Sequence, residues 1–335
     1  MKMMKTLALI GAVSIGAASL TGCSAVTDGK QIVRISHSQS EIHPEHLGLL
    51  KFEELIEEKL GDKYDIQIYP NELLGSSKNA IELCQTGAID FVIAATANLE
   101  TFDNVYEIFS MPYLFTSEEA YKAVMNDSEY MRKVYETTEQ SGFEALAWYT
   151  AGSRSFYAKK PINTPADLKG MKMRVQQSPA SVNMMNEFGA AAAPMSFGEV
   201  YTAIQAGVID GAENNELALT NNKHGEVAKY YSYNKHQMVP DMLIGSTAFL
   251  DKLSDEERKI FEEAAIQSSL VEQEEWDKAV EVAKKEASEN MGVQFIEVDV
   301  EAFRDAAKQA QTDMLEKNPK IQQLYNHIQE VNERY

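Results

Sequence analysis

The chain has 335 residues, 44% of them hydrophobic, and carries 51 acidic against 31 basic side chains, a net charge of −20 at pH 7. A chain of this length can bury enough apolar surface for two domains, and its negative charge argues against a nucleic-acid partner. Only two cysteines are present, Cys23 and Cys84, too few for a disulfide framework, so stability must come from a packed core.

The N-terminus has the features of a secretion signal. Two lysines precede an apolar run, Leu7–Leu20, which is too short to span a bilayer comfortably and ends in the motif Leu20-Thr21-Gly22-Cys23. This motif resembles the cleavage site of a bacterial lipoprotein. The resemblance implies that residues 1–22 are removed, that Cys23 is acylated with palmitate as a membrane anchor, and that residues 23–30 form a tether. The alternative is a buried core helix.

The next segment predicts a parallel strand–helix–strand unit. A strand over Gln31–Ser36 precedes a helix over Pro44–Leu60, which has apolar residues at helical spacing, and a second strand follows over Tyr64–Tyr69. Ligands of open α/β sheets lie beyond the carboxyl ends of the strands. The candidate binding residues at these ends are His37, Ser38 and Glu72.

Three histidines in this region suggest a metal site, because imidazole is a common zinc ligand. They are His37, His43 and His46, but their spacing is irregular and the chain has no His-rich loop. We therefore expect no metal, a hydrogen bond from His37 to a ligand, and an exposed position for His46 in the first turn of its helix.

Two related hexapeptides follow, 120 residues apart. Gln85-Thr-Gly-Ala-Ile-Asp90 and Gln205-Ala-Gly-Val-Ile-Asp210 match at four of six positions, and each connects a predicted helix to a short strand, over Phe91–Thr96 and Gly211–Asn214 respectively. Chance similarity is the alternative to a repeat. A repeat predicts two lobes built on one plan. The residues that would then face each other across a cleft include Thr96, Glu213, Asn214 and Asn215.

Between these hexapeptides the first lobe continues with a helix over 117–138 and a strand over 143–149, and the chain crosses into the second lobe near 150–152. Arg154 then precedes an aromatic, strand-forming run. Arg174 lies on a strand over Met171–Val175, where alternation separates it and Gln176 from the apolar side. If an acidic protein binds an anion, it needs a local cationic pocket. This requirement favours a pocket position for Arg154 and Arg174 over the alternative, a solvated surface position.

The remainder predicts a return to the first lobe and then mostly helices. A capping box at Ser196 opens a helix ending at Gly207, and the chain crosses back over 238–250. A long helix follows over 254–290, with coiled-coil dimerisation as its alternative function. Charged helices over 300–315 and 320–335 are expected at the surface.

Five segments in this order and spacing, together spanning about residues 31–335, resemble a known family. They are Tyr69-Pro70…Leu74-Gly75, Gly87–Phe91, Leu168–Val175, Phe197–Ile204 and Asp210–Asn214. The chain resembles the DctP-type solute receptors of tripartite ATP-independent periplasmic (TRAP) transporters. The resemblance implies an extracytoplasmic, monomeric receptor, in the periplasm or at the cell surface, that needs no cofactor or metal and delivers a small organic acid to the membrane subunits of a TRAP permease.

The resemblance also implies the fold and its division. The fold would be α/β, a two-lobed, type II-like periplasmic-binding-protein clamshell that closes on its ligand, with the long helix spanning both lobes. The first lobe would comprise residues 31–151 plus 240–280, and the second lobe residues 152–239 plus 281–335.

In this family an arginine at the position of Arg174 holds the ligand carboxylate with both arms of its guanidinium group, a geometry that lysine cannot supply. Arg154 would add a second charged contact and Asn214 would bind the same end of the ligand. The other residues implied to contact the ligand are His37, Ser38, Glu72, Thr96, Gln176, Phe197, Glu213 and Asn215, although core packing is the alternative for Phe197.

Three departures distinguish the chain from sialic-acid receptors. Asn215 follows Asn214 where those receptors have proline, Ala95 stands where they have a carboxylate, and His37 replaces a small amide. The motifs are more similar to those of receptors for hexuronates, glucuronate or galacturonate, with sialic acid and C4-dicarboxylates as alternatives.

A lipid-anchored hydrolase is the competing class. Glu72 and Glu213 could imitate the carboxylate pair of a glycosidase. The chain has no Gly-x-Ser-x-Gly elbow, no His-Glu-x-x-His and no phosphate-binding glycine loop, so nothing supplies an activated nucleophile. We therefore predict a receptor and not an enzyme.

Overall fold

The computed structural model describes residues 26–27 and 29–335. The predicted signal sequence and the anchor residue Cys23 lie outside the described residues. Within residues 26–27 and 29–335, no helix combines the length and the apolar character needed to cross a membrane.

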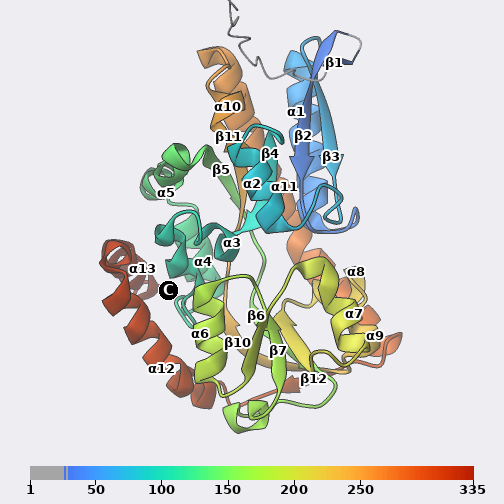
Figure 1. Ribbon diagram of the computed structural model, residues 1–335, viewed down its shortest axis with the longest axis vertical. Coiled ribbons are helices and arrows are strands. Elements are labelled where there is room, and N and C mark those ends of the chain that lie inside the picture. The colour runs from blue at the N-terminus through green and yellow to red at the C-terminus, as the bar shows by residue number, and fades with distance from the viewer. Residues whose placement is uncertain (1–25, 28) are drawn as a thin grey trace, which may run out of the picture.

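Two six-stranded sheets form two lobes, one above the other in Figure 1. The first sheet has the order β1 (Val26–Thr27), β2 (Lys30–Ser36), β4 (Phe91–Ala95), β11 (Asp241–Ser246) and β5 (Phe143–Tyr149), with β3 (Tyr64–Tyr69) parallel to β2. The second has the order β12 (Gln294–Glu297), β10 (Tyr230–Gln237), β6 (Arg154–Ala158), β9 (Gly211–Asn214), β7 (Lys172–Val175) and β8 (Ala191–Pro194).

Helices cover both sheets. Those before the second lobe are α1 (Pro44–Leu60), α2 (Ser77–Gln85), α3 (Thr96–Leu99), α4 (Glu118–Met125) and α5 (Ser128–Tyr135), with 3-10 turns η1 (Asn104–Ser110) and η2 (Glu136–Ser141). The later ones are α6 (Pro179–Glu187), α7 (Val200–Gln205), α8 (Leu217–Asn221), α9 (His224–Val227), α10 (Thr247–Leu250), α11 (Asp255–Glu289), α12 (Val300–Lys317) and α13 (Gln322–Asn332), with η3 (Pro165–Leu168), η4 (Phe197–Glu199) and η5 (Pro319–Ile321).

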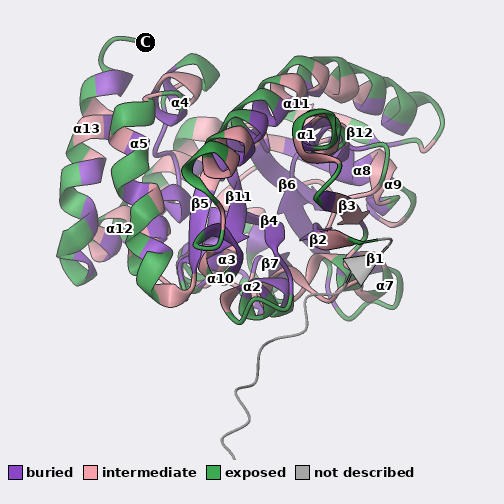
Figure 2. Cartoon of the chain, turned by 90° about the horizontal axis from the view of Figure 1, so that it is seen from above, coloured by how far each residue is buried: buried purple, intermediate pink, exposed green. Residues whose placement is uncertain are grey.

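The long helix α11 joins the two lobes. Its 35 residues correspond to roughly 52 Å at about 1.5 Å per residue. Phe261 and Ala264 pack in the first lobe and Ala287 in the second. In Figure 2 the ribbon of α11 carries buried residues along one side and exposed residues along the other. Gly48 of α1 allows close contact, because a β-carbon there would lie 2.7 Å from the Ser268 carbonyl oxygen of α11. The predicted two-lobed α/β fold with a helix spanning both lobes is confirmed.

The related hexapeptides have the same local structure in both lobes. The helices α2 and α7 end at Gln85 and Gln205, and Gly87 and Gly207 follow two residues later with φ angles of 73° and 71°. The carboxylate of Asp90 accepts the backbone N–H of Arg34 on β2 at 2.8 Å, and that of Asp210 accepts the N–H of Lys172 on β7 at 2.7 Å. Each aspartate therefore fixes a strand to its parallel neighbour, and the two lobes repeat one plan.

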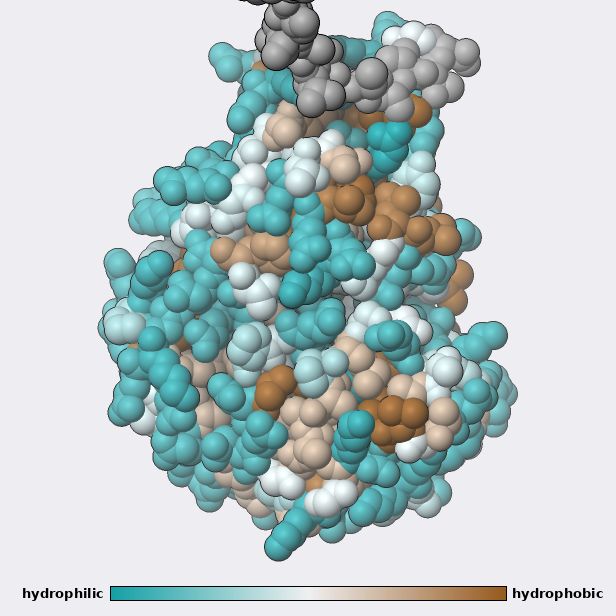
Figure 3. Space-filling view, viewed as in Figure 1, coloured by the Kyte–Doolittle hydropathy of each residue, from teal (hydrophilic) through white to brown (hydrophobic). Residues whose placement is uncertain are grey.

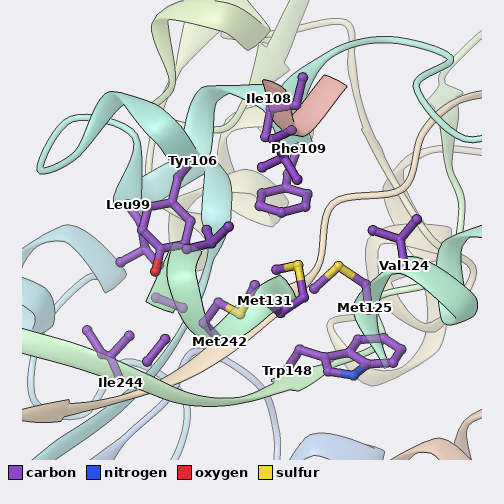
Figure 4. Close-up of a cluster of buried hydrophobic side chains, with 14 of the residues drawn as sticks. Leu99, Tyr106, Ile108, Phe109, Val124, Met125, Met131, Trp148, Met242 and Ile244 are labelled. Atoms are coloured by element: carbon purple, nitrogen blue, oxygen red, sulfur yellow. The ribbon is translucent and has the colours of Figure 1, made fainter. Parts of the chain in front are cut away.

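The C-terminal helix differs from the expectation. Leu324, Ile328 and Val331 of α13 lie in the core of the first lobe, part of which is shown in Figure 4, whereas α12 packs on α6 of the second lobe. The assignment of residues 281–335 wholly to the second lobe is therefore wrong for α13, whereas the expected surface position of 320–335 holds for the exposed face of this helix. The physical reason is the apolar stripe of α13, which contacts α4.

One predicted helix is divided. Residues 117–138 form α4, α5 and the turn η2, because the Asp127 side chain accepts the Tyr130 N–H at 3.1 Å and starts a new helix. The face in Figure 3 is mostly hydrophilic, with separate small hydrophobic patches, as expected for a chain of net charge −20.

Candidate functional site

A cavity lies between the lobes, with about 610 Å³ of space between its atoms, including the part open to solvent. The first lobe contributes Ser38, Glu45, Glu72 and Asp241, and the second contributes Arg154, Arg174, Phe197 and Asn214. Strand ends and the loops that follow them supply most of these residues, as the parallel strand order predicts.

Arg174 projects from β7 into the cavity wall. Its neighbours Met173 and Val175 pack in the core of the second lobe, so alternation turns Arg174 the other way. Its Nε and Nη2 donate to the Met195 carbonyl oxygen at 3.2 and 3.0 Å, and its guanidinium carbon lies 5.6 Å from the centre of the Phe197 ring. Burial lowers the pKa of Arg174 from its ordinary value, but an arginine remains charged. Within the described part of the chain, Nη1 has no hydrogen-bond partner.

Arg154 is held by the protein itself. Its Nε lies 2.5 Å from Glu213 Oε2, its Nη1 donates to Asn214 Oδ1 at 2.9 Å and its Nη2 to the Glu213 carbonyl oxygen at 2.8 Å. Each of the three nitrogens is engaged through one N–H, so two of the five donors of Arg154, one on Nη1 and one on Nη2, remain beside its positive charge.

Glu213 lies behind Arg154 and is absent from the cavity wall. It is 1% exposed, and His236 Nε2 lies 3.5 Å from its Oε2. Burial alone would raise the pKa of Glu213, but the charge of Arg154, its hydrogen bond to Glu213 and the nearby His236 outweigh burial and lower the pKa to about 2. Glu213 is therefore ionised and paired with Arg154.

The adjacent amides have different tasks. Asn215 is part of the scaffold, since its Nδ2 donates to the Ala151 carbonyl oxygen at 3.0 Å and its Oδ1 accepts the Leu217 N–H. Asn214 accepts from Arg154 and from the Asn215 N–H through Oδ1. Its Nδ2 has no acceptor among the described residues and remains available to a ligand.

Glu72 connects the lobes. It follows β3 with φ of 56°, in the left-handed region, and its Oε2 accepts the Gly198 N–H of the second lobe at 3.2 Å. The structure therefore has the two lobes in contact around the cavity. Glu72 and Glu213 do not form a matched pair, since each is engaged with different groups.

Ser38, Gln176, Phe197, Asn215 and Glu72 line the cavity together with the two arginines and Asn214, whereas His37, Thr96 and Glu213 do not. Thr96 is fully buried. The His37 ring is buried behind the wall, with Nε2 3.0 Å from His46 Nδ1. His46 is only 8% exposed, so the expectation of an exposed position is wrong: it packs on His37.

The cavity wall also contains residues that the sequence did not single out as ligand contacts, His43, Glu45 and Asp241. Burial lowers the pKa of His43 to about 3, so its imidazole is neutral. Two features of the sequence could have indicated these residues. His43 and Glu45 flank Pro44, where the helix begins, and Asp241 directly follows Pro240. Across residues 26–27 and 29–335, no group of three or more His, Cys, Asp or Glu side chains is arranged to hold a metal ion.

The fold and the interlobe cavity define a two-lobed solute-binding protein, and comparison with known proteins gives its family. Residues 35–318 match the DctP family, "Bacterial extracellular solute-binding protein, family 7". The chain belongs to this family, and it is a solute receptor of a TRAP transporter. The protein YiiZ of Salmonella typhimurium, described as uncharacterized, is 38% identical over 93% of this chain and 95% of its own length.

Solved structures agree. A TRAP periplasmic solute-binding protein from Anaerococcus prevotii, crystallised with bound α/β-D-glucuronate, is 55% identical with a TM-score of 0.90, over 91% of this chain and 99% of that one. A protein of the same kind from Sulfitobacter with bound β-D-galacturonate is 33% identical with a TM-score of 0.84, over 88% and 98%. The family is one of solute receptors and not of enzymes.

Proposed function

We propose that this protein is the extracytoplasmic receptor that binds a hexuronate, glucuronate or galacturonate, and delivers it to the membrane subunits of a TRAP permease. The observation that carries the proposal is the incompletely bonded, buried guanidinium group of Arg174 in the interlobe cavity. The glucuronate and galacturonate bound by similar proteins from Anaerococcus and Sulfitobacter support the choice of ligand.

In this proposal the ligand carboxylate bonds to Nη1 of Arg174 and to the remaining hydrogen of Nη2. Asn214 donates to the same carboxylate through Nδ2, and Arg154 contributes its charge. Ser38, Glu72, Gln176, Phe197 and Asn215 surround the rest of the ligand. We propose supporting roles for His37, Thr96 and Glu213, which hold the wall from behind.

A thermal-shift comparison of D-glucuronate, D-galacturonate, sialic acid and succinate tests the choice of ligand. A ligand at 100 times its dissociation constant stabilises the folded state by about 2.7 kcal/mol. We expect a hexuronate to raise the melting temperature by roughly 5 °C or more, with the sugar recovered chemically unchanged. Stabilisation by sialic acid or succinate alone would contradict the hexuronate assignment, and conversion of the sugar would favour the hydrolase.

We also propose that a lipid on Cys23 anchors the mature, monomeric protein to the membrane, on the basis of the motif Leu20-Thr21-Gly22-Cys23. In the native host, Cys23→Ala is expected to move the protein from the membrane to the soluble fraction. A Cys84→Ala variant is the control and should fractionate like wild type. Retention of Cys23→Ala in the membrane would rule out this anchor.

A further inference from the structure

Three buried carboxyl groups from three elements meet at the first-lobe side of the cavity. Glu45 lies in the first turn of α1, Asp241 begins β11 and Glu272 lies on α11, and they are 2%, 9% and 0% exposed. The side chains of Glu45 and Asp241 are within hydrogen-bonding reach of each other. Glu272 accepts the Thr150 N–H at 3.0 Å through Oε2.

Glu45 and Asp241 line the cavity and Glu272 does not. Glu45 Oε1 is 3.4 Å from His37 Nδ1, yet neither atom has a hydrogen-bond partner among the residues that the structure describes. Leaving a buried polar atom without a partner costs about 1–3 kcal/mol. The carboxyl group of Glu45, which lines the cavity, therefore has hydrogen-bonding capacity that the described residues do not use.

The groups around Glu45 and Asp241 do not supply enough positive charge to neutralise both carboxylates of this pair. The titratable or charged groups that face it are His37, His43 and His46 near the start of α1, Tyr121 on α4, Tyr149 on β5, Arg154 on β6 and Glu272 on α11. Arg154 is the one permanent cation among them, and it is already paired with Glu213. Burial lowers the pKa of His37 to about 4, so this imidazole is neutral.

Burial raises the pKa of both Glu45 and Asp241 well above its ordinary value, and the charge of Glu45 adds to this effect on Asp241. Two carboxyl groups in contact titrate as a unit and not separately. At neutral pH the pair therefore keeps at least one proton, and it is both a donor and an acceptor of hydrogen bonds.

We propose that Glu45 and Asp241 form a proton-sharing pair that binds the hydroxyl groups of the ligand and excludes a second carboxylate from this side of the cavity. The inference rests on the proposed function and deepens it: Arg174, on the second lobe, takes the one carboxylate. The ligand class is then a polyhydroxylated monocarboxylic acid, and dicarboxylates are rejected by charge.

The pair also couples binding to pH. At high pH it loses its proton and repels an anionic ligand, so the bound anion favours the protonated pair. Affinity is therefore full below the pKa of the pair and falls as the pH rises through it, by up to tenfold per pH unit for one coupled proton.

Titration calorimetry of the wild-type protein with D-glucuronate between pH 6 and 9.5 tests this coupling. We expect affinity to fall at least tenfold over this range. At pH 8, injections in phosphate and in Tris should differ in heat because binding takes up a proton. Constant affinity over this pH range, together with equal binding heats after correction for dilution in the two buffers, would show that no proton is taken up and would overturn the inference. This measurement uses the wild-type protein alone.

Glu45→Gln and Asp241→Asn test the exclusion of a second carboxylate. Each variant should flatten the pH dependence and reduce the preference for D-glucuronate over D-glucarate, its dicarboxylate counterpart, at least tenfold. Glu58→Gln removes the same charge from the exposed side of α1 and should match wild type. If the folded variants keep the pH dependence and the ligand preference of wild type, the inference about Glu45 and Asp241 is overturned, while the proposed function stands. If the wild-type protein binds no hexuronate at any pH, the proposed function itself is overturned.

Discussion

Arg174→Lys is expected to weaken hexuronate binding by roughly ten- to a hundredfold, with little change in the stability of the unliganded protein. The guanidinium group contacts the Met195 carbonyl oxygen with Nε and Nη2 and still has donors for a carboxylate. A lysine ammonium keeps the charge, but it lacks the planar fork that lets one side chain donate to the Met195 carbonyl oxygen and to a ligand carboxylate at the same time. A hydrogen bond to a charged group contributes about 1.5–3 kcal/mol, and about 1.4 kcal/mol corresponds to a tenfold change in affinity.

Calorimetric titration with D-glucuronate measures the loss, and Lys172→Ala on the same strand is the control. Lys172 is exposed, so its side chain should not affect binding. Near-wild-type affinity in Arg174→Lys would mean that the carboxylate is held elsewhere.

Glu213→Gln should destabilise the unliganded protein by about 3–5 kcal/mol, the usual effect of removing one partner of a buried ion pair. Arg154 is 4% exposed and would lose its ion-pair partner, and the contact between Glu213 and His236 would change too. Denaturant unfolding at pH 7 measures this difference. Because the pKa of Glu213 is lowered to about 2 in the folded protein, its contribution is present above its ordinary pKa and is lost as the pH falls towards 2.

The double variant Arg154→Met/Glu213→Gln is the matched comparison. It removes both charges, so its loss should be clearly smaller than the sum of the two single losses. Additive losses, or a single Glu213→Gln variant within about 1 kcal/mol of wild type, would show that this pair does not carry the stability assigned to it.

Local patterns predicted much of the fold. The helix over Pro44–Leu60 and the strand over Tyr64–Tyr69 have the predicted bounds, because proline and glycine mark the helix ends and apolar periodicity marks its length. The long helix was predicted within a residue at each end, from the capping box at Ser254 and the absence of internal glycine or proline. The repeat at Gly87 and Gly207 indicated the two lobes.

Elements that depend on distant contacts were not predicted. The polar strand β10 owes its position to pairing with β6 and β12, and α13 owes its lobe to contacts with α4 nearly 200 residues earlier. The break between α4 and α5 had a local signal in Asn126-Asp127-Ser128, but the hydrophobic pattern on both sides continues through it.

For the residues of the candidate site, the sequence predicted the residue types better than the contacts that each residue makes. Alternation along β7 placed Arg174 toward the cavity, but no sequence pattern shows that Glu213 and Asn214 accept three of the five N–H donors of Arg154. The meeting of Glu45 with Asp241 joins residues from α1 and β11, far apart in the chain, and only the packed fold brings them together.

The segment that crosses between the lobes near Gly152 packs closely against α11, and this contact affects how the lobes can move. Gly152, with φ of 58°, lies so close to Trp276 of α11 that a β-carbon there would be 2.9 Å from the indole ring. A continuous helix of 35 residues resists bending, so α11 is a rigid element that packs against both lobes. A movement of one lobe relative to the other would therefore have to be taken up by the short crossing segments, where Gly152 packs against Trp276.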